Sequence, residues 1–254
     1  MDLSKPLQGW RKCLKMMSCS LGRVCVRCVG FHNVDIIGTK AHKDIAPVIV
    51  AAPHSSFFDA LAIFWSGLPF FVSREENKEI PFIGKCIQFA QAIHVKREDR
   101  NDRQKTKDEI NRRCQSNDPW EQFLIFPEGT TSNRKALMTF KPGGFLPGKT
   151  IQPLLIKYKN HHDTVSWTWD QPHGFMSCFL WTCCQWNNRV ELHFLDPYTP
   201  SEEERNDPRL FAENVRQVMA TALGVPLCDM TFEDIKEMYS TKTKNPGEKE
   251  EKKD

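Results

Sequence analysis

Long apolar runs are missing from this 254-residue sequence. A helix needs about 18 consecutive apolar residues to cross a bilayer. The longest candidate, residues 60–72, is interrupted by Ser66, Gly67 and Pro69. It also follows directly on Asp59, so it is typical of a core helix that gives way to a strand. We therefore expect no membrane-spanning helix in this sequence.

Acidic residues are scarce at the start of the chain, where Asp2 is the only one before Asp35. Six basic residues occupy the same stretch: Lys5, Arg11, Lys12, Lys15, Arg23 and Arg27. Apolar residues recur there at the three- and four-residue steps of one helical stripe, namely Trp10, Leu14, Met17, Leu21, Val24, Cys28 and Phe31. A basic amphipathic helix is typical of a membrane-surface element. A helix packed on the core, with its charges solvated, is an equal alternative.

The ten cysteines lack the spacing of a disulfide framework, and no secretory signal pattern is present. We therefore expect reduced thiols that face the cytosol. Cys25 and Cys28 form a single C-x2-C without a second pair, which favours small apolar residues on a helix over a metal site. No calcium-binding loop pattern occurs, so calcium is not implied. The net charge of +3 gives no argument for a nucleic-acid partner.

A histidine and an aspartate are the first candidates for chemistry. His54 and Asp59 are separated by four residues and follow Pro53. Five helical steps would point the two side chains roughly 140° apart, so they meet only if His54 lies in the turn before a helix, with Ser55 or Ser56 as its N-cap. Histidine can accept a proton from a hydroxyl near neutral pH, and a carboxylate can fix its tautomer. By itself the motif is also compatible with a capped helix start and a solvated histidine.

A short apolar run at residues 123–126 predicts a buried strand that ends in a cluster of Pro, Glu, Gly and hydroxyl residues at 127–133. In open α/β sheets ligands bind at the carboxyl ends of the strands. An ordinary strand-to-loop turn would give the same local pattern.

Four sequence blocks in order resemble the PlsC-type glycerophospholipid acyltransferase family. His54 and Asp59 match its H-x4-D block, Arg97 ends the second block, residues 126–132 read FPEGTTS in the third, and Pro153 matches the fourth. The family often has arginine where Thr131 stands. This departure and the residues at 52–56, 164–169 and 198–204 look most like the lysophosphatidylcholine acyltransferase branch.

The resemblance implies transfer of a fatty acyl group from acyl-CoA, as co-substrate, to the hydroxyl of a lysophospholipid, without a metal or other cofactor. In this interpretation His54 is the general base and Asp59 orients it. The implied substrate-binding residues are Arg97 as a phosphate clamp, Glu128, Gly129 and Thr130 in the acceptor site, and Lys141 as a second cation, although a plain surface lysine is nearly as well supported. The expected location is the cytosolic face of the endoplasmic reticulum membrane, with lipid droplets as an alternative.

Three alternatives remain open at this point. The acceptor could be another lysophospholipid, such as lysophosphatidic acid, although the absence of arginine at Thr131 weakens a grip on a phosphate monoester. The chain could be a non-catalytic lipid-surface module of the same fold. It could also be a metal-dependent hydrolase that uses His54 and Asp59 as ligands, although no further His or Asp lies close by at ligand spacing, and the cluster His161-His162-Asp163 looks isolated.

Alternation of strand and helix patterns predicts an α/β fold with a mixed, largely parallel sheet flanked by helices. We expect an N-terminal helix in 1–33, an acyltransferase domain in 34–200, a helical extension in 201–240 and a disordered charged tail in 241–254. The apolar stretch 175–186 is too short to span a bilayer. A core helix is its default interpretation, with a lipid-interface patch or an acyl-chain groove as alternatives.

Overall fold

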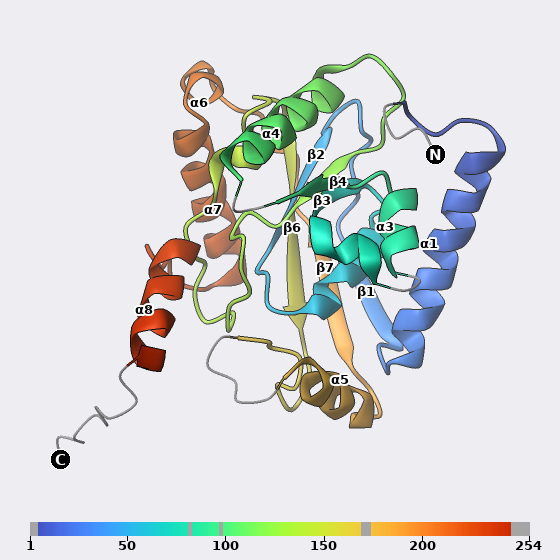
Figure 1. Ribbon diagram of the computed structural model, residues 1–254, viewed down its shortest axis with the longest axis vertical. Helices are drawn as coiled ribbons and strands as arrows, with labels where there is room; N and C mark the ends of the chain where they lie inside the picture. Colours follow the sequence, from blue (N-terminus) through green and yellow to red (C-terminus); the bar gives the residue numbers. More distant parts are fainter. Residues whose placement is uncertain (1–4, 81–82, 97–98, 169–173, 245–254) are drawn as a thin grey trace.

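A computed structural model describes residues 5–80, 83–96, 99–168 and 174–244, and they form a seven-stranded sheet with the order β1-β7-β6-β2-β5-β3-β4 (Figure 1). The strands are β1 (Asn33–Ile37), β2 (Val48–Ala52), β3 (Phe70–Arg74), β4 (Ile93–Val95), β5 (Phe123–Ile125), β6 (Ile151–Tyr158) and β7 (Arg189–Phe194). All neighbouring strands pair in parallel except β6 and β7. The predicted mixed, largely parallel sheet is therefore confirmed.

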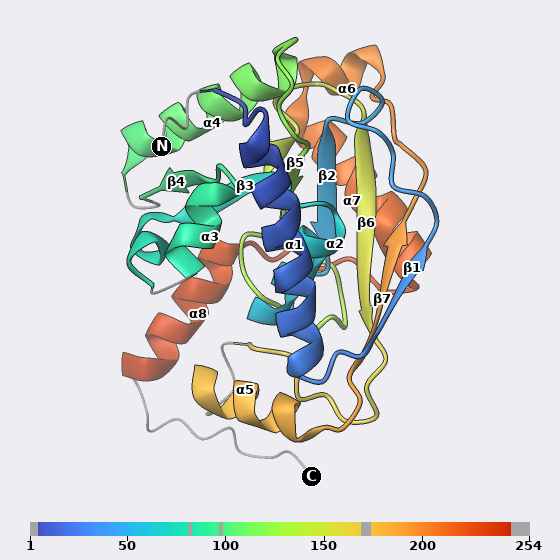
Figure 2. The ribbon, with the colours of Figure 1, turned by 90° about the vertical axis from the view of Figure 1, so that its right-hand side faces the viewer.

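Helices lie on both faces of this sheet, with α1 and α7 on opposite sides (Figures 1 and 2). The α-helices are α1 (Trp10–Cys28), α2 (Leu61–Trp65), α3 (Ile83–Phe89), α4 (Arg100–Gln115), α5 (Phe175–Cys184), α6 (Glu202–Asn206), α7 (Pro208–Leu223) and α8 (Phe232–Lys244). Short 3-10 helices are η1 (Phe57–Ala60), η2 (Glu75–Glu79) and η3 (Pro142–Gly144). No described helix combines the length and the apolar character that crossing a membrane requires.

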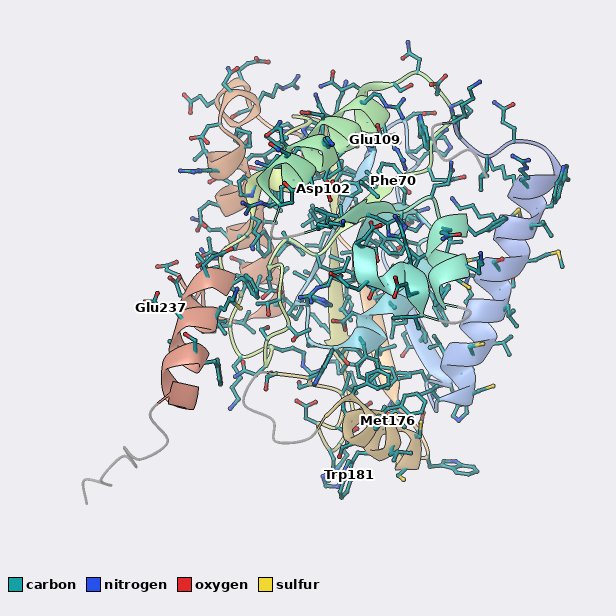
Figure 3. All side chains as sticks on the ribbon, viewed as in Figure 1. Phe70, Asp102, Glu109, Met176, Trp181 and Glu237 are labelled. Atoms are coloured by element: carbon teal, nitrogen blue, oxygen red, sulfur yellow. The ribbon has the colours of Figure 1, made fainter. Side chains whose placement is uncertain are left out.

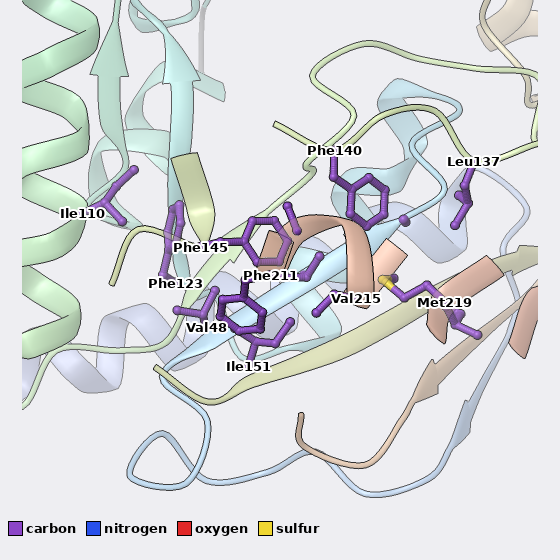
Figure 4. Packing of buried hydrophobic residues seen from close by; sticks show 14 of the residues in the cluster. Val48, Ile110, Phe123, Leu137, Phe140, Phe145, Ile151, Phe211, Val215 and Met219 are labelled. Carbon is purple, nitrogen blue, oxygen red and sulfur yellow. The ribbon is translucent and has the colours of Figure 1, made fainter. Parts of the chain in front are cut away.

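Strand β2 lies at the centre of the sheet and is buried on both faces. Val48 and Val50 point into one hydrophobic cluster, whereas Ile49 and Ala51 point into the other, as the two-residue period of a strand dictates. The first cluster contains Phe211, Val215 and Met219 of α7 (Figure 4). The predicted extension 201–240 therefore supplies one of the helices that cover the sheet.

Helix α1 packs on α2 through a face that the apolar spacing did not indicate. Its buried residues are Lys15, Cys19 and Gly22. A Cβ atom at Gly22 would overlap the Phe64 ring of α2, so glycine permits this close approach. The predicted stripe lies on the opposite side: Trp10, Met17, Leu21 and Val24 are all more than half exposed, and Leu14 is 38% exposed.

Two details of the predicted termini of helices need correction. Phe31 is not part of the α1 stripe, because the helix ends at Cys28 and Phe31 is fully buried in the core. At the other end of the chain, α8 continues to Lys244, so the disorder predicted from residue 241 is wrong for 241–244. Lysine has a high helix propensity, and no glycine or proline interrupts residues 232–244. Residues 245–254 lie outside the described part of the chain.

Candidate active site

The predicted catalytic pair is assembled at the carboxyl end of β2. His54 Nδ1 lies 2.8 Å from Asp59 Oδ2. The aspartate is fully buried, and the side chain of His54 is 24% exposed. Because the carboxylate occupies Nδ1, Nε2 is the ring nitrogen left to face a substrate.

A helix cap brings these two residues together. Ser56 is the N-cap of η1, and its hydroxyl accepts a hydrogen bond from the N–H of Phe58. Asp59 completes a capping box by accepting the N–H of Ser56 at 2.9 Å. His54 therefore lies in the turn before the helix, as the spacing of the motif requires, and its partly exposed imidazole is hydrogen-bonded to Asp59.

Asp59 is held by four donors in total. Its Oδ2 also accepts the N–H of Ser55 at 2.6 Å, and its Oδ1 accepts the hydroxyl of Tyr158 at 2.7 Å. Burial raises the pKa of the Tyr158 hydroxyl well above its usual value, and the Asp59 carboxylate adds to this shift. The phenol therefore stays protonated and donates to Asp59. A carboxylate with this many donors is fixed in place and stabilised as an anion.

The loop after β5 supports the backbone of His54. Glu128 is fully buried and accepts the N–H of His54 at 2.6 Å and the N–H of Met138 at 3.4 Å. Desolvation raises the pKa of the Glu128 carboxyl to about 7. The Glu128 carboxylate thus contacts the backbone of the predicted base His54, and the Glu128 side chain has no exposed surface.

Two further contacts fix His54 from the same loop. The N–H of Ser132 donates to the carbonyl oxygen of His54 at 2.7 Å, and the ring of Phe126 stacks on the imidazole with centroids 4.4 Å apart. Strands β2 and β5 are parallel neighbours, so the loops that leave their carboxyl ends meet. This topology joins two sequence blocks that are more than 70 residues apart.

The remaining predicted residues surround this loop to different extents. Gly129 adopts φ +69°, and a Cβ atom there would lie 2.9 Å from Lys141 Cε, so both the backbone and the close approach favour glycine. Thr130 is buried beside it. Lys141 packs over Gly129, but its ammonium pairs with Glu233 of α8 at 3.1 Å. Arg97 lies outside the described residues.

Tyr158 and Arg134 of the site were missed by sequence reasoning, and Asp163 was assigned to an isolated cluster. Besides Tyr158, Arg134 lies with its guanidinium carbon 5.1 Å from the Tyr158 ring centroid and pairs with Asp163 at 2.8 Å. Asp163 is therefore tied to the site and is not isolated. The buried strand β6 pairs in parallel with β2, and this pairing could have suggested that Tyr158, the last residue of β6, lies near His54. No local sequence pattern marks Arg134 or Asp163 as part of the site.

Within the described residues, no group of three or more His, Cys, Asp or Glu side chains is arranged to hold a metal ion. The Asp59 carboxylate also does not fit the role of a metal ligand, because Oδ2 already accepts three hydrogen bonds. The pair is instead arranged as a histidine with its orienting carboxylate, which is the geometry of general-base chemistry.

Comparisons with known proteins agree with this geometry. A family model described as Acyltransferase matches residues 33–157. The chain is 47% identical to lysophosphatidylcholine acyltransferase from Drosophila melanogaster over 91% of its own length, and 45% identical to human lysophosphatidylcholine acyltransferase 2 over 94%. It spans 43% and 44% of the lengths of these two curated relatives, respectively.

A solved structure shares the fold. The crystal structure of the 1-acyl-sn-glycerophosphate acyltransferase PlsC from Thermotoga maritima superimposes with a TM-score of 0.53, covering 86% of this chain and 83% of that one at 18% identity. The matched family region contains the His54–Asp59 pair and the loop with Glu128. The chain belongs to the acyltransferase family, and within that family it is similar to the lysophosphatidylcholine acyltransferases.

Proposed function

We propose that this chain transfers a fatty acyl group from acyl-CoA to the free hydroxyl of a lysophospholipid, with lysophosphatidylcholine as the acceptor. The observation that carries the proposal is the buried Asp59 carboxylate 2.8 Å from Nδ1 of the partly exposed His54. A non-catalytic lipid-surface module would have no need of a histidine held in one tautomer by a carboxylate with four donors.

In this proposal each step of the transfer is carried by a named atom. Nε2 of His54 removes the proton from the lysolipid hydroxyl as its oxygen attacks the thioester carbonyl carbon. The Asp59 carboxylate stabilises the resulting imidazolium. When the carbon–sulfur bond breaks, the proton passes from Nε2 to the thiolate of CoA. These reaction steps use neither a metal nor a redox cofactor.

The acceptor is proposed from the third sequence block and from the relatives. Thr131 stands where the family often has arginine, which supports a phosphodiester headgroup over a phosphate monoester. The similar proteins from Drosophila melanogaster and human are named for lysophosphatidylcholine. Arg97 is proposed as the guanidinium that binds the lipid phosphate, since its planar fork matches phosphate oxygens.

The substrate is a lipid, so we propose that the protein works at a membrane surface, on the cytosolic face of the endoplasmic reticulum. The exposed apolar stripe of α1 supports this, because Met17, Leu21 and Val24 face solvent while the opposite side of the helix is packed. Burying such a stripe in the headgroup region removes apolar area from water.

One assay tests the function directly. The purified protein is incubated with labelled acyl-CoA and, in separate reactions, with lysophosphatidylcholine, lysophosphatidylethanolamine and lysophosphatidic acid, with and without EDTA. We expect labelled phosphatidylcholine to form fastest and EDTA to have no effect. Transfer to lysophosphatidic acid alone would contradict the acceptor assignment. Loss of transfer with EDTA, restored by a divalent cation, would contradict the metal-free mechanism.

A further inference from the structure

Helix α5 presents an apolar face to solvent. Met176, Leu180 and Trp181 are 59%, 54% and 62% exposed, and Trp186, just beyond the helix, is 91% exposed. Figure 3 shows Met176 and Trp181 on α5 at the lower edge of the molecule, with Trp181 directed away from the sheet. No Asp, Glu, Lys, Arg or His occurs from residue 175 to 188. A contiguous apolar surface of this kind marks an interaction site.

The inner face of α5 packs on the turn that carries the catalytic carboxylate. The ring centroid of Phe175 lies 4.5 Å from that of Phe57, and Phe179 lies 6.2 Å from Phe58. Phe57 and Phe58 are the first two residues of η1, which also contains Asp59. Aromatic rings of α5 therefore contact the turn that carries Asp59.

The C-terminal ends of α5 and α1 lie close to each other (Figure 2). Asn188 lies just after α5. Its backbone N–H donates to the carbonyl oxygen of Gly30 at 2.8 Å, and its side-chain amide donates to the carbonyl oxygen of Val29 at 3.4 Å. These two residues follow α1 directly, and Figure 2 shows the C-terminal end of α1 close to α5. The exposed Leu21 and Val24 of α1 lie in the last two turns of that helix.

We infer that α5 is a second bilayer-docking element, whose outer face enters the headgroup region and brings the site of His54 to the lipid surface. The inference rests on the proposed function, since a lipid acceptor has to pass from the bilayer to the site. Exposed tryptophans without charged neighbours are typical of a membrane interface. The adjoining helix α1 carries basic residues and no acidic ones, which suits an anionic or zwitterionic lipid surface.

The test uses vesicles of phosphatidylcholine alone, in which net surface charge is absent, so that apolar insertion dominates binding. A variant with Leu180→Ser, Trp181→Ser and Trp186→Ser is compared with wild type by co-sedimentation. We expect vesicle affinity to fall about tenfold or more, with little dependence on salt. The matched control is Ile45→Ser, which removes a 59% exposed apolar side chain before β2, at the end of the sheet opposite His54, and leaves binding unchanged.

Activity measurements separate docking from folding and from the reaction itself. For the triple variant, transfer to vesicle-bound lysolipid should fall in parallel with binding, whereas transfer to a short-chain monomeric lysolipid should stay within about twofold of wild type. Unchanged vesicle binding would overturn the inference, as would a lowered thermal stability with equal loss of both activities. A dimer that the triple substitution dissociates, without change in vesicle binding, would assign the face to a second copy. Absence of transfer by wild type would refute the proposed function but leave the vesicle result interpretable.

Discussion

Asp59 is the residue on which the geometry of the site depends. It receives two backbone N–H groups, the imidazole of His54 and the hydroxyl of Tyr158. The first three donors act on Oδ2, and among the described residues Tyr158 alone donates to Oδ1. The phenol therefore controls the rotation of the carboxylate that orients the base.

Replacing Tyr158 with phenylalanine tests this positioning role. Loss of a hydrogen bond to a charged group costs roughly 1.5–3 kcal/mol, so we expect kcat to fall about tenfold or more. Asp59→Asn serves as the stronger comparison and should lose more activity, because the tautomer of His54 is no longer fixed. A Tyr158→Phe enzyme with normal kcat would show that the phenol only fills space.

Glu128 predicts a pH dependence of stability. Its pKa in the folded chain is about 7, raised from 4.5 by burial, so the folded state holds a proton that the unfolded state has released between these two values. Its contribution to the free energy of unfolding is therefore largest at low pH and declines as the pH rises from about 4.5 to 7.

Glu128→Gln removes this titration and keeps an oxygen that can accept the N–H of His54. Relative to wild type, the variant should gain stability as the pH is raised from 5 to 8, measured by urea denaturation at each pH. The control is Glu203→Gln, because Glu203 is exposed, and it should show no such trend. Gln122→Glu would not serve as a control, because Gln122 is buried. An equal offset at both pH values would contradict the raised pKa.

At the scale of elements, the turn between α3 and β4 carries backbone strain. Gln91 has φ +57°, a conformation that favours glycine. Its carbonyl oxygen accepts a hydrogen bond from the buried Arg113 at 2.7 Å. The turn is thus fixed by α4, and this fixation offsets the strain at Gln91.

The strain can be measured by comparing Gln91→Gly with Gln91→Ala, since both remove the same side-chain hydrogen bond to Lys5. A left-handed conformation costs a residue with a Cβ atom about 1 kcal/mol or more. The glycine variant should therefore be the more stable of the two by about that amount in thermal denaturation. The usual order, with alanine more stable, would show that the turn relaxes to a negative φ.

The packing of helix α1 changes the interpretation of its basic residues, because some of them are part of the contact with α2. Lys15 is buried, and Arg23 donates to the carbonyl oxygen of Phe64 and lies over the Trp65 ring. Neutralising these residues would disturb the packing of α1 on α2. Bilayer binding by α1 is therefore better tested on its exposed apolar stripe than on its full set of charges.

Met17→Ser with Leu21→Ser should reduce binding to vesicles that contain anionic lipid by about tenfold or more, because each buried apolar side chain contributes roughly 1.5–3 kcal/mol. Both side chains are about two-thirds exposed, so thermal stability should change little. Ser20→Ala on the same helix is the control and should bind normally. Normal vesicle binding by the double variant would refute the contact between α1 and the bilayer.

For the whole molecule, the sheet explains which parts of the site were predictable. The apolar runs at 48–52 and 123–125 are buried strands, and their parallel pairing brings His54 and Glu128 together. The spacing of His54 and Asp59 likewise required the cap that Ser56 provides. These features depend on local patterns and on general rules of topology.

Tertiary contacts account for what the sequence could not predict. Tyr158 reaches Asp59 only because β6 lies beside β2, and Arg134 meets Asp163 across two loops. The stripe of α1 correctly predicted a helix but not which face is packed, because Cys19 and Gly22 make the contact and neither is strongly apolar. Small residues permit close approach, and a hydrophobic pattern does not reveal this.

The most direct test of the account is acyl transfer by His54→Gln compared with wild type, with labelled acyl-CoA and monomeric short-chain lysophosphatidylcholine. Use of a monomeric acceptor removes membrane binding from the measurement. Loss of a general base typically lowers the rate by about 10²–10⁴-fold, and the fold should persist because the backbone contacts of His54 with Glu128 and Ser132 do not involve its ring. The account predicts a folded variant with a rate reduced by at least about a hundredfold. A folded His54→Gln variant that forms phosphatidylcholine at the wild-type rate would contradict it.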